Sequence, residues 1–513
     1  MIRGPGGTLW GANAVNGIIN IITRNAKDTQ GTLVDVGGGS EDRAFGSARY
    51  GGTSGALSYR AYGKAFDRAP EFHADGNNYD GFRGGQGGAR ADWSLANQRT
   101  LTIQGDAYDL RLGERPSVTS YTPPFSQATN LDAPLSGGNV LVRYAGSNFQ
   151  LQTYYDRTNR DEIPVAEDRD TADVDFQQTL RSGRRNTLTW GAGYRITSGR
   201  IRAIPPTAFT PNDRTDQLYS AFGQDEIVLS PNRWRLTLGA KVEHNDYSGF
   251  EIQPSARLLW TPDRKDVLWA SVTRAVRTPS RVETDYTTAS LATTAPLPTF
   301  VRLLPNPDFV PEELIAYELG YRARPIDRAY VTVSAFYNDL QHTLSTELLT
   351  AFVETTPPPV HLILPVDFAN GLHGNSQGVE MTGEVRLASW WRLTGNYSYL
   401  YVAMSRNPGS RDVSQEKHYE GAIPRHQVQA GSSFDVARWS FDWLFRYVSD
   451  LPASSVPSYS ASDIRVGWRL NSHVELSLVG QDLFDDHHLE WPSGSGANIE
   501  IQRSVYGRLT WRK

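Results

Sequence analysis

Cysteine is absent from the 513 residues of this chain, and methionine occurs only 3 times. The lack of cysteine excludes disulfide frameworks, thiolate metal sites and cysteine nucleophiles. No run approaches the roughly 18 to 20 apolar residues that a membrane-spanning helix needs. The net charge is -5, and Lys and Arg are spread along the chain, so there is no basic surface for a nucleic acid backbone. Nucleic acid is therefore not an expected partner.

Apolar residues recur with a two-residue period in several segments. They occupy Trp234, Leu236, Leu238, Ala240 and Val242 in one segment, Leu188, Trp190, Ala192, Tyr194 and Ile196 in another, Trp439, Phe441, Trp443, Phe445 and Tyr447 in a third, and Ile464, Val466, Trp468 and Leu470 in a fourth. This period is typical of strands with one apolar and one polar face. No segment sustains a helical period, and the predicted fold class is all-β.

The connections between these strands alternate between two lengths. Short turns rich in Gly, Pro, Asn or Asp are predicted at 145–148, 230–233, 262–265, 325–328 and 470–473. Long polar or Pro-rich loops are predicted near 66–90, 110–138, 157–172, 198–214, 280–311, 340–374, 402–421 and 482–499. About 10 short turns and 11 loops imply about 22 antiparallel strands, which form a transmembrane β-barrel whose lumen is wide enough to need a plug.

Tryptophan placement supports a membrane barrel. Five tryptophans lie within a few residues of a predicted short turn: Trp93, Trp234, Trp260, Trp391 and Trp439. Any one of them could be ordinary packing. Several at the same end of successive strands indicate a girdle at the membrane interface, where an indole places its ring in lipid and its N–H in water.

The first 23 residues contain short motifs that carry a family resemblance. They are Arg3-Gly4-Pro5, Gly11-Ala12-Asn13-Ala14 and Asn16-Gly17-Ile18-Ile19-Asn20-Ile21. The series resembles the end of the plug domain of TonB-dependent outer-membrane receptors. The plug-motif residues that the resemblance assigns are Arg3, Gly4, Pro5, Gly11, Asn13, Ala14, Asn16, Gly17, Asn20 and Ile21. We expect the isoleucines of this stretch to form a buried strand, and Arg3 to pair with a lumen carboxylate such as Glu243, Glu318 or Glu384.

Further segments resemble barrel motifs of the same family and follow the family's order. They are Leu188-Thr189-Trp190-Gly191, Gln224-Asp225-Glu226, Arg274-Ala275-Val276-Arg277-Thr278-Pro279, Asn306-Pro307 with Glu312, Tyr317-Glu318-Leu319-Gly320, Pro424-Arg425-His426 and Gly480-Gln481-Asp482-Leu483-Phe484-Asp485. The resemblance implies two parts, residues 1–27 as the C-terminal end of a plug domain and residues 28–513 as the barrel. It also implies N-terminal truncation, because the family's signal peptide, TonB-binding segment and most of its plug would precede Met1.

The resemblance implies a receptor in the outer membrane of a Gram-negative bacterium, not an enzyme, with no cofactor. Its expected cargo is a scarce ligand such as a ferric siderophore, taken up at high affinity. Its expected partners are outer-membrane lipid and, in the full-length protein, the TonB complex; the chain is expected to be a monomer. Cobalamin or an oligosaccharide remains open as the ligand, as does a role as a passive large pore or surface receptor remnant. The ligand-binding residues stay unassigned.

Two other patterns point away from metal chemistry. Asp485-Asp486-His487-His488 with Glu490 has the composition of a metal cluster, but it follows a family motif at the start of the last long loop, so no metal site is predicted. Heme-uptake relatives carry a histidine between the two motifs that contain Arg277 and Asn306. Residues 280–305 contain none, which disfavours heme.

Overall fold

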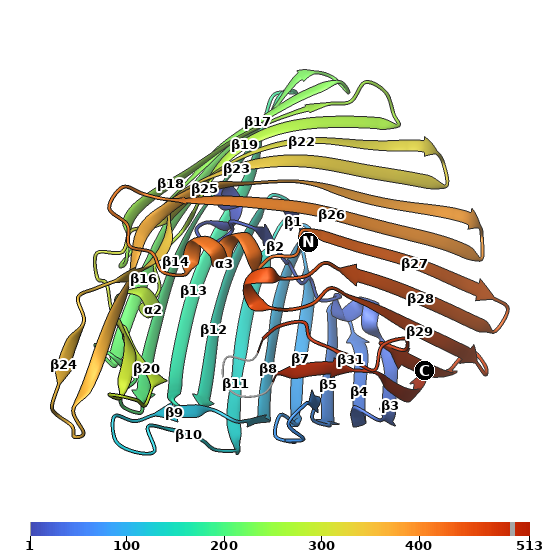
Figure 1. Cartoon of the computed structure of the whole chain (residues 1–513). Coiled ribbons are helices and arrows are strands. Elements are labelled where there is room, and N and C mark those ends of the chain that lie inside the picture. Colours follow the sequence, from blue (N-terminus) through green and yellow to red (C-terminus); the bar gives the residue numbers. More distant parts are fainter. Residues whose placement is uncertain (1, 493–497) are drawn as a thin grey trace.

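Twenty-two strands form one closed antiparallel barrel in this computed structural model (Figure 1). The structure describes residues 2–492 and 498–513, without the side chains of Ile2 and Arg3. Each barrel strand pairs with the next barrel strand along the chain. The last one closes the ring on the first, with Val34 opposite Trp511. The all-β class and the strand number predicted from the sequence are confirmed.

The barrel begins at Gly31, close to the boundary predicted after residue 27. Its strands are β3 (Gly31–Gly39), β4 (Asp42–Ser54), β5 (Leu57–Arg68), β7 (Phe82–Leu95), β8 (Arg99–Glu114), β11 (Leu131–Ala145), β12 (Phe149–Asp161), β13 (Val165–Ser182), β14 (Asn186–Ala203), β16 (Asp213–Ser230), β17 (Trp234–Asn245), β18 (Gly249–Trp260), β19 (Asp266–Arg277), β22 (Glu312–Ile326), β23 (Ala329–Leu348), β25 (His361–Ala388), β26 (Trp391–Arg406), β27 (His426–Val436), β28 (Trp439–Val448), β29 (Tyr459–Arg469), β30 (Val474–Gln481) and β33 (Ser504–Arg512).

The remaining elements are short. They are β1 (Ile2–Arg3), α1 (Gly7–Trp10), β2 (Gly17–Ile18), η1 (Ala26–Thr29), β6 (Phe72–His73), β9 (Ser117–Thr119), β10 (Ser126–Ala128), β15 (Ala208–Phe209), α2 (Arg281–Thr284), β20 (Tyr286–Thr293), β21 (Thr299–Leu304), β24 (Phe352–Glu354), α3 (Gln415–Gly421), η2 (Pro452–Ser454), β31 (His487–His488) and β32 (Ile499–Gln502). Across the described residues, no helix has both the length and the apolar character needed to cross a membrane.

The connections alternate as the sequence predicted. Ten connections of two to five residues join the strands at one end, and all five of the predicted short turns are among them. Asn232 adopts a left-handed φ of 59° in one of these turns, a conformation that asparagine tolerates. The other end carries eleven connections, most of them long. A small apolar core of Ala289, Phe300 and Ile363 lies at this end, with Tyr121 and Phe125 packed against it, and it links the β8–β11 and β19–β22 connections to the start of β25.

Two predicted loops are wrong in extent, because most of their residues continue barrel strands. Residues 157–172 form the ends of β12 and β13, joined only by 162–164, and residues 340–374 include the ends of β23 and β25. Their polar and charged side chains have the composition that is typical of loops. A ladder of backbone hydrogen bonds tolerates polar side chains on both faces where the strand stands in water, so pairing continues beyond the apolar band.

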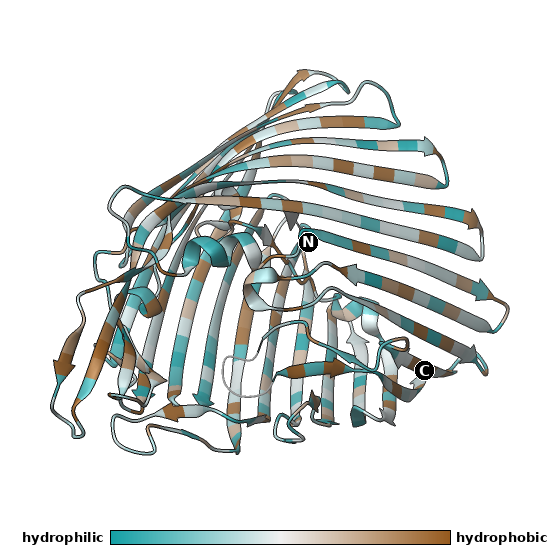
Figure 2. Ribbon diagram, viewed as in Figure 1, coloured by the Kyte–Doolittle hydropathy of each residue, from teal (hydrophilic) through white to brown (hydrophobic). Residues whose placement is uncertain are grey.

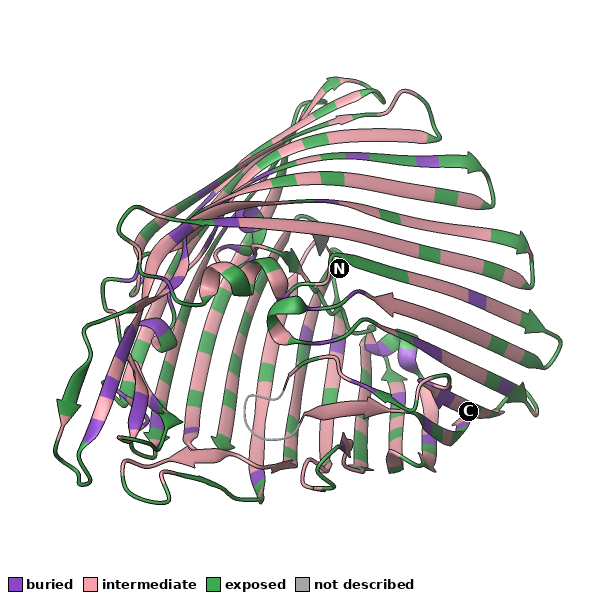
Figure 3. Cartoon of the chain, in the orientation of Figure 1, coloured by how far each residue is buried: buried purple, intermediate pink, exposed green. Residues whose placement is uncertain are grey.

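Alternation along the strands separates an outer face from the lumen. Figure 2 shows apolar and polar residues interleaved along the strands, and Figure 3 shows the corresponding alternation of exposure. On β17, Leu238 is 44% exposed on the outer face, whereas Glu243, at an odd position, is 3% exposed inside. The tryptophans predicted to form a girdle all lie at the short-turn end, and Trp234 stacks on Trp260 with ring centroids 5.4 Å apart.

Candidate ligand-binding lumen

Residues 4–30, the lumenal strap, lie inside the ring of strands (Figure 1). The strap contains α1, β2 and η1 and precedes the first barrel strand. Its helix α1 packs on the inner faces of β16 to β19. The Thr8 hydroxyl donates to the Gln253 carbonyl at 3.2 Å and lies 2.8 Å from the Ser255 hydroxyl. Hydrogen bonds between the strap and the wall therefore begin at its first helical turn.

The buried carboxylate of Glu243 is the main acceptor for this end of the strap. Its Oε2 accepts from the backbone N–H of Ala12 at 2.6 Å and from the Gln253 side-chain amide at 2.7 Å. Lys241 Nζ lies 3.5 Å from Oε1 and balances the charge. Gly11 has φ 82° and ψ -163°, a conformation essentially restricted to glycine. A Cβ on Gly11 would also overlap the Glu243 carboxylate, so both conformation and space require glycine here.

Asn13 joins the strap to the segment that follows β19. Its backbone N–H donates to the Val276 carbonyl at 2.8 Å. Its side chain accepts from the Thr278 N–H at 3.1 Å and donates to the Thr278 hydroxyl at 3.2 Å. Two motifs that are 265 residues apart in the sequence, one containing Asn13 and the other Thr278, thus form one contact. Neither motif alone indicates that partner.

The C-terminal end of the strap is bound to a different part of the wall. Asp92 of β7 accepts from the Ala26 N–H at 2.8 Å, and Arg90 donates to the Thr23 hydroxyl at 2.8 Å. Arg60 of β5 donates to the Arg24 carbonyl at 2.7 Å. The strap therefore runs between two anchored ends, one on β17 to β19 and one on β5 and β7.

The middle of the strap differs from the prediction of a buried isoleucine strand. Only Gly17 and Ile18 are in a strand, as a two-residue bridge to β1. Ile19, Ile21 and Ile22 are 75%, 83% and 81% exposed. Ile21 and Ile22 line the lumenal cavity described below, and the described residues leave all three side chains largely uncovered.

The predicted plug-motif residues divide into four groups. Gly11, Asn13 and Ala14 lie in the anchored part, and Arg3 pairs with Gly17 through the backbone of β1 and β2. Asn20 and Ile21 line the cavity described below. Gly4, Pro5 and Asn16 lie in the turns between these parts, and a Cβ on Gly4 would be 3.7 Å from Glu318 Oε2. The Arg3 side chain lies outside the described part, so its pairing with Glu243, Glu318 or Glu384 stays a prediction.

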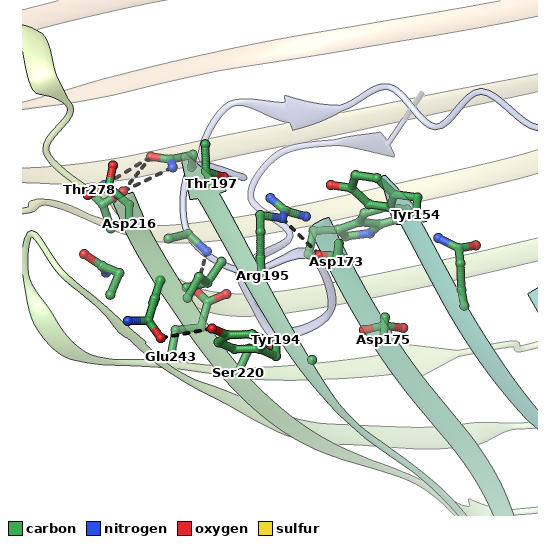
Figure 4. Close-up of a pocket in the computed structure, with 18 of the residues that line it drawn as sticks. Tyr154, Asp173, Asp175, Tyr194, Arg195, Thr197, Asp216, Ser220, Glu243 and Thr278 are labelled. Carbon is green, nitrogen blue, oxygen red and sulfur yellow. Dashed lines mark hydrogen bonds and ion pairs between the residues drawn. The ribbon is translucent and has the colours of Figure 1, made fainter. Parts of the chain in front are cut away.

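A cavity of about 1590 Å³ lies between the strap and the inner faces of the barrel strands from β7 to β17. Figure 4 shows side chains from neighbouring strands pointing into it. Its lining is rich in charged groups, amides and tyrosines. Arg195 Nε donates to Asp173 at 3.0 Å, and the Arg195 guanidinium lies 5.9 Å from the centre of the Tyr154 ring. These groups offer hydrogen-bond donors and acceptors of both signs to a molecule in the lumen.

The cavity extends toward the long connections, where α2 and the β17–β18 turn contribute. Arg214 donates to Asp216 at 2.6 Å and to Asp285 at 3.0 Å, and it lies 4.2 Å above the Tyr247 ring. Burial and the neighbouring Asp216 carboxylate raise the pKa of Tyr247 above its ordinary value, so this phenol stays protonated. Arg281 of α2 also donates to the Asp285 carboxylate, at 3.1 Å, so Asp285 accepts from both Arg214 and Arg281.

The acidic and histidine-rich segment at the start of the last long connection serves packing. His488 stacks on Tyr459 with ring centroids 4.2 Å apart and pairs with Asp485 and Glu490 at 3.2 and 3.3 Å. Burial lowers the pKa of His488, but the carboxylates around it, Glu490 first, raise it overall. His487 stacks on Phe72. Within residues 2–492 and 498–513, no group of three or more His, Asp or Glu side chains is arranged to hold a metal ion.

The family model "TonB dependent receptor-like, beta-barrel" matches residues 20–483. The chain belongs to this family. The TonB-dependent receptor resemblance seen in the sequence is therefore confirmed, and so is an outer-membrane location in a Gram-negative bacterium. TonB-dependent receptors are receptors and transporters, not enzymes. The motifs quoted from this sequence now have positions in the barrel: Arg277-Thr278-Pro279 ends β19 beside the strap, and Gly480-Gln481 ends β30.

Relatives and solved structures agree with this assignment. The chain is 23% identical over 522 residues to the iron-regulated outer membrane virulence protein of Vibrio cholerae, covering 94% of this chain and 75% of that protein. It is 24% identical over 362 residues to the vitamin B12 transporter BtuB of Vibrio vulnificus, covering 67% of this chain and 54% of that protein.

Two solved TonB-dependent receptors share the fold. The siderophore receptor PirA of Acinetobacter baumannii superposes with a TM-score of 0.78 at 16% identity, over 100% of this chain and 84% of that one. A mutant of the ferric enterobactin receptor PfeA of Pseudomonas aeruginosa, in complex with enterobactin, gives a TM-score of 0.78 at 17% identity, over 100% and 85%.

Proposed function

We propose that this protein captures a ferric siderophore at the cell surface and admits it through the barrel. The observation that carries the proposal is the polar cavity of about 1590 Å³ between the strap and the wall of a TonB-dependent receptor barrel. A large, hydrogen-bonding lumen suits a polar chelate better than an apolar solute. An iron-regulated relative and structural neighbours named as siderophore receptors support iron as the cargo element.

We also propose that residues 1–27 act as the C-terminal end of a plug domain and residues 28–513 as the barrel. The hydrogen bonds that the strap donates to Glu243 and Asp92 and accepts from Thr278 support this division, because they hold the segment inside the lumen. In this proposal, TonB acts on the plug and shifts the strap between a bound and a released state. A ligand biases that equilibrium only by binding the two states with different affinities.

The barrel is proposed to work as a monomer in contact with outer-membrane lipid. Closure of β33 on β3 supports this, since a closed sheet leaves no edge for another copy to extend. Apolar residues on the outer face, such as Leu319 and Val174, suit contact with lipid hydrocarbon. The short turns are proposed to face the periplasm and the long connections the medium.

Uptake of radiolabelled ferric siderophore tests the proposal. The protein is produced in a Gram-negative host whose own siderophore receptors are deleted, in strains with and without TonB. We expect iron accumulation and growth under iron limitation only when TonB is present. Accumulation of iron at the same rate without TonB would contradict energised uptake and favour the passive pore.

Vitamin B12 transport is the second candidate, because the match to BtuB covers 67% of this chain. Labelled cobalamin in the same two strains separates the candidates. TonB-dependent uptake of cobalamin without uptake of iron would replace the siderophore proposal.

A further inference from the structure

We propose that the chelate taken into the lumen carries little net charge, as a ferric trihydroxamate does, and is not a trianionic ferric tris-catecholate. This inference rests on the proposed siderophore function and adds the chemical class of the ligand. Three hydroxamates each lose one proton, so their complex with Fe³⁺ is neutral. Three catecholates each lose two protons, so their complex carries three negative charges. The electrostatics of the cavity distinguish these two classes.

Five of the six arginines that line the cavity are paired with a carboxylate, and the sixth, Arg143, donates to the Gln152 side chain instead. Toward the long connections, each of the four arginines that line it has an acidic partner in the described structure. The pairs are Arg169 with Glu167 at 3.7 Å, Arg195 with Asp173 at 3.0 Å, Arg214 with Asp216 at 2.6 Å and with Asp285 at 3.0 Å, and Arg281 with Asp285 at 3.1 Å. An anionic ligand would have to compete with these carboxylates for the guanidinium groups.

The charges of the whole lining come close to cancelling. Seven lining residues are basic, namely Arg90, Arg143, Arg169, Arg195, Arg214, Lys241 and Arg281, and six are acidic, namely Glu167, Asp173, Asp175, Asp216, Glu243 and Asp246. Asp92 and Asp285 lie just behind the lining and pair with Arg90 and Arg214. The lining itself thus sums to a formal charge of only +1, and Arg90 and Arg214 are compensated from behind. The cavity therefore provides little positive field to offset the removal of a trianion from water.

The uncharged part of the lining suits a ligand with amide and hydroxamate groups. Ten lining residues are amides: Asn13, Asn20, Asn25, Gln104, Gln150, Gln152, Gln177, Gln217, Gln224 and Asn245. Each amide offers both donors and an acceptor. Tyr154 and Tyr247 add phenol groups and ring faces. Gln104 and Gln152 already accept from Arg90 and Arg143, but at the other amides a neutral chelate can exchange its hydrogen bonds to water without competing with an arginine.

Arginines between the cavity and the long connections are also paired with carboxylates. Arg277 donates to Glu283 at 2.9 Å and to Glu312 at 2.6 Å. Arg302 forms a two-point contact with Glu354 at 2.8 and 2.6 Å. A ligand approaching from this end thus meets arginines whose charge is already compensated, as it does in the cavity.

The test compares two ferric chelates on the purified 513-residue chain in detergent, by quenching of tryptophan fluorescence. The probes are ferrichrome, a neutral trihydroxamate, and ferric enterobactin, a trianionic tris-catecholate. We expect ferrichrome to bind at least ten-fold more tightly, with an affinity that changes less than two-fold between 50 and 500 mM salt. Tighter binding of ferric enterobactin would overturn the inference and leave the siderophore function standing. Binding of neither chelate would overturn both.

A charge variant makes the test specific to the cavity. Asp173→Asn together with Asp216→Asn frees Arg195 from its carboxylate and leaves Arg214 with only one of its two, Asp285, so affinity for ferric enterobactin should rise at least ten-fold. Asp132→Asn is the matched control, since Asp132 pairs with Arg83 at 3.1 Å away from the cavity and both side chains are exposed. Heat-modifiable migration on gels confirms that each variant has folded. An equal gain in the control, or no gain in the double variant, would contradict the proposed role of the carboxylates.

Discussion

Gly11→Ala tests whether the strap is held to the wall through Glu243. Alanine would have to adopt φ 82° and ψ -163°, which costs about 1 to 3 kcal/mol for a residue with a Cβ. The added Cβ would also displace the Glu243 carboxylate, which accepts the Ala12 N–H at 2.6 Å. Loss of a hydrogen bond to a charged group adds roughly 1.5 to 3 kcal/mol. The combined cost of roughly 2.5 to 6 kcal/mol favours the detached strap by about 10² to 10⁴-fold.

Hydrogen exchange measured by mass spectrometry detects this change directly. The peptide covering residues 6–15 contains the Ala12 and Asn13 amides, which donate to Glu243 and to the Val276 carbonyl. We expect exchange in this peptide to accelerate about 100-fold or more in Gly11→Ala, until it reaches the rate of an unprotected amide. Exchange in β17 should stay unchanged, because the ladder of the barrel does not depend on the strap.

Gly249→Ala is the control for backbone strain alone. Gly249 also has a positive φ, 68°, but no atom lies within 4 Å of the position that its Cβ would take. This variant should leave exchange in residues 6–15 at the level of the unmodified protein. The reasoning fails if Gly11→Ala exchanges at that level too, since the strap would then be held by contacts other than the one through Glu243.

Three other predictions follow from the outer face, one loop and the orientation. Leu319→Arg should reduce the amount of folded barrel, measured by heat-modifiable migration on gels, far more than Ser334→Arg does. Arginine on the lipid face costs about 2 to 4 kcal/mol, whereas Ser334 faces the lumen. Equal losses in the two variants would contradict the assignment of the faces. Burial and a neighbouring carboxylate raise the pKa of Glu71 from 4.5 to about 7. Glu71 therefore binds its proton more tightly in the folded loop than in the opened loop. The folded loop loses stability as the pH rises from about 4.5 to about 7, so the protection of its amides from hydrogen exchange should fall over that range. Glu71→Gln should remove that dependence. Protease added to intact cells should cut the β23–β25 connection within 349–360 and spare the β22–β23 turn at 327–328. Cleavage at 327–328 alone would contradict the proposed orientation of the barrel in the membrane.

The family and the strand number were predictable because they depend on local and repeated signals. A two-residue period can be recognised from a short stretch of sequence alone, such as the one from Trp234 to Val242. Turn residues such as Asn232 report local backbone geometry, so their spacing also marks the ends of strands. Where a strand continues into water this signal fails, as it did for residues 157–172.

The candidate site depended on contacts that no local pattern contains. Gly11 and Asn13 were recognised as motif residues, but the groups they face, Glu243 on β17 and Thr278 just after β19, lie more than 200 residues away in the sequence. The exposure of Ile21 shows the same limit, since apolar composition alone indicated burial.

The sequence by itself determined the all-β class, the alternation of faces and the family, because these follow from side-chain period and short motifs. Only the tertiary structure decided which charges meet inside the lumen. Arg195 and Asp173 lie on adjacent strands, and Arg214 and Asp285 are 71 residues apart. Whether an arginine is free to hold an anion depends on which carboxylate the closed barrel places beside it, and that depends on strand register and the path of the loops.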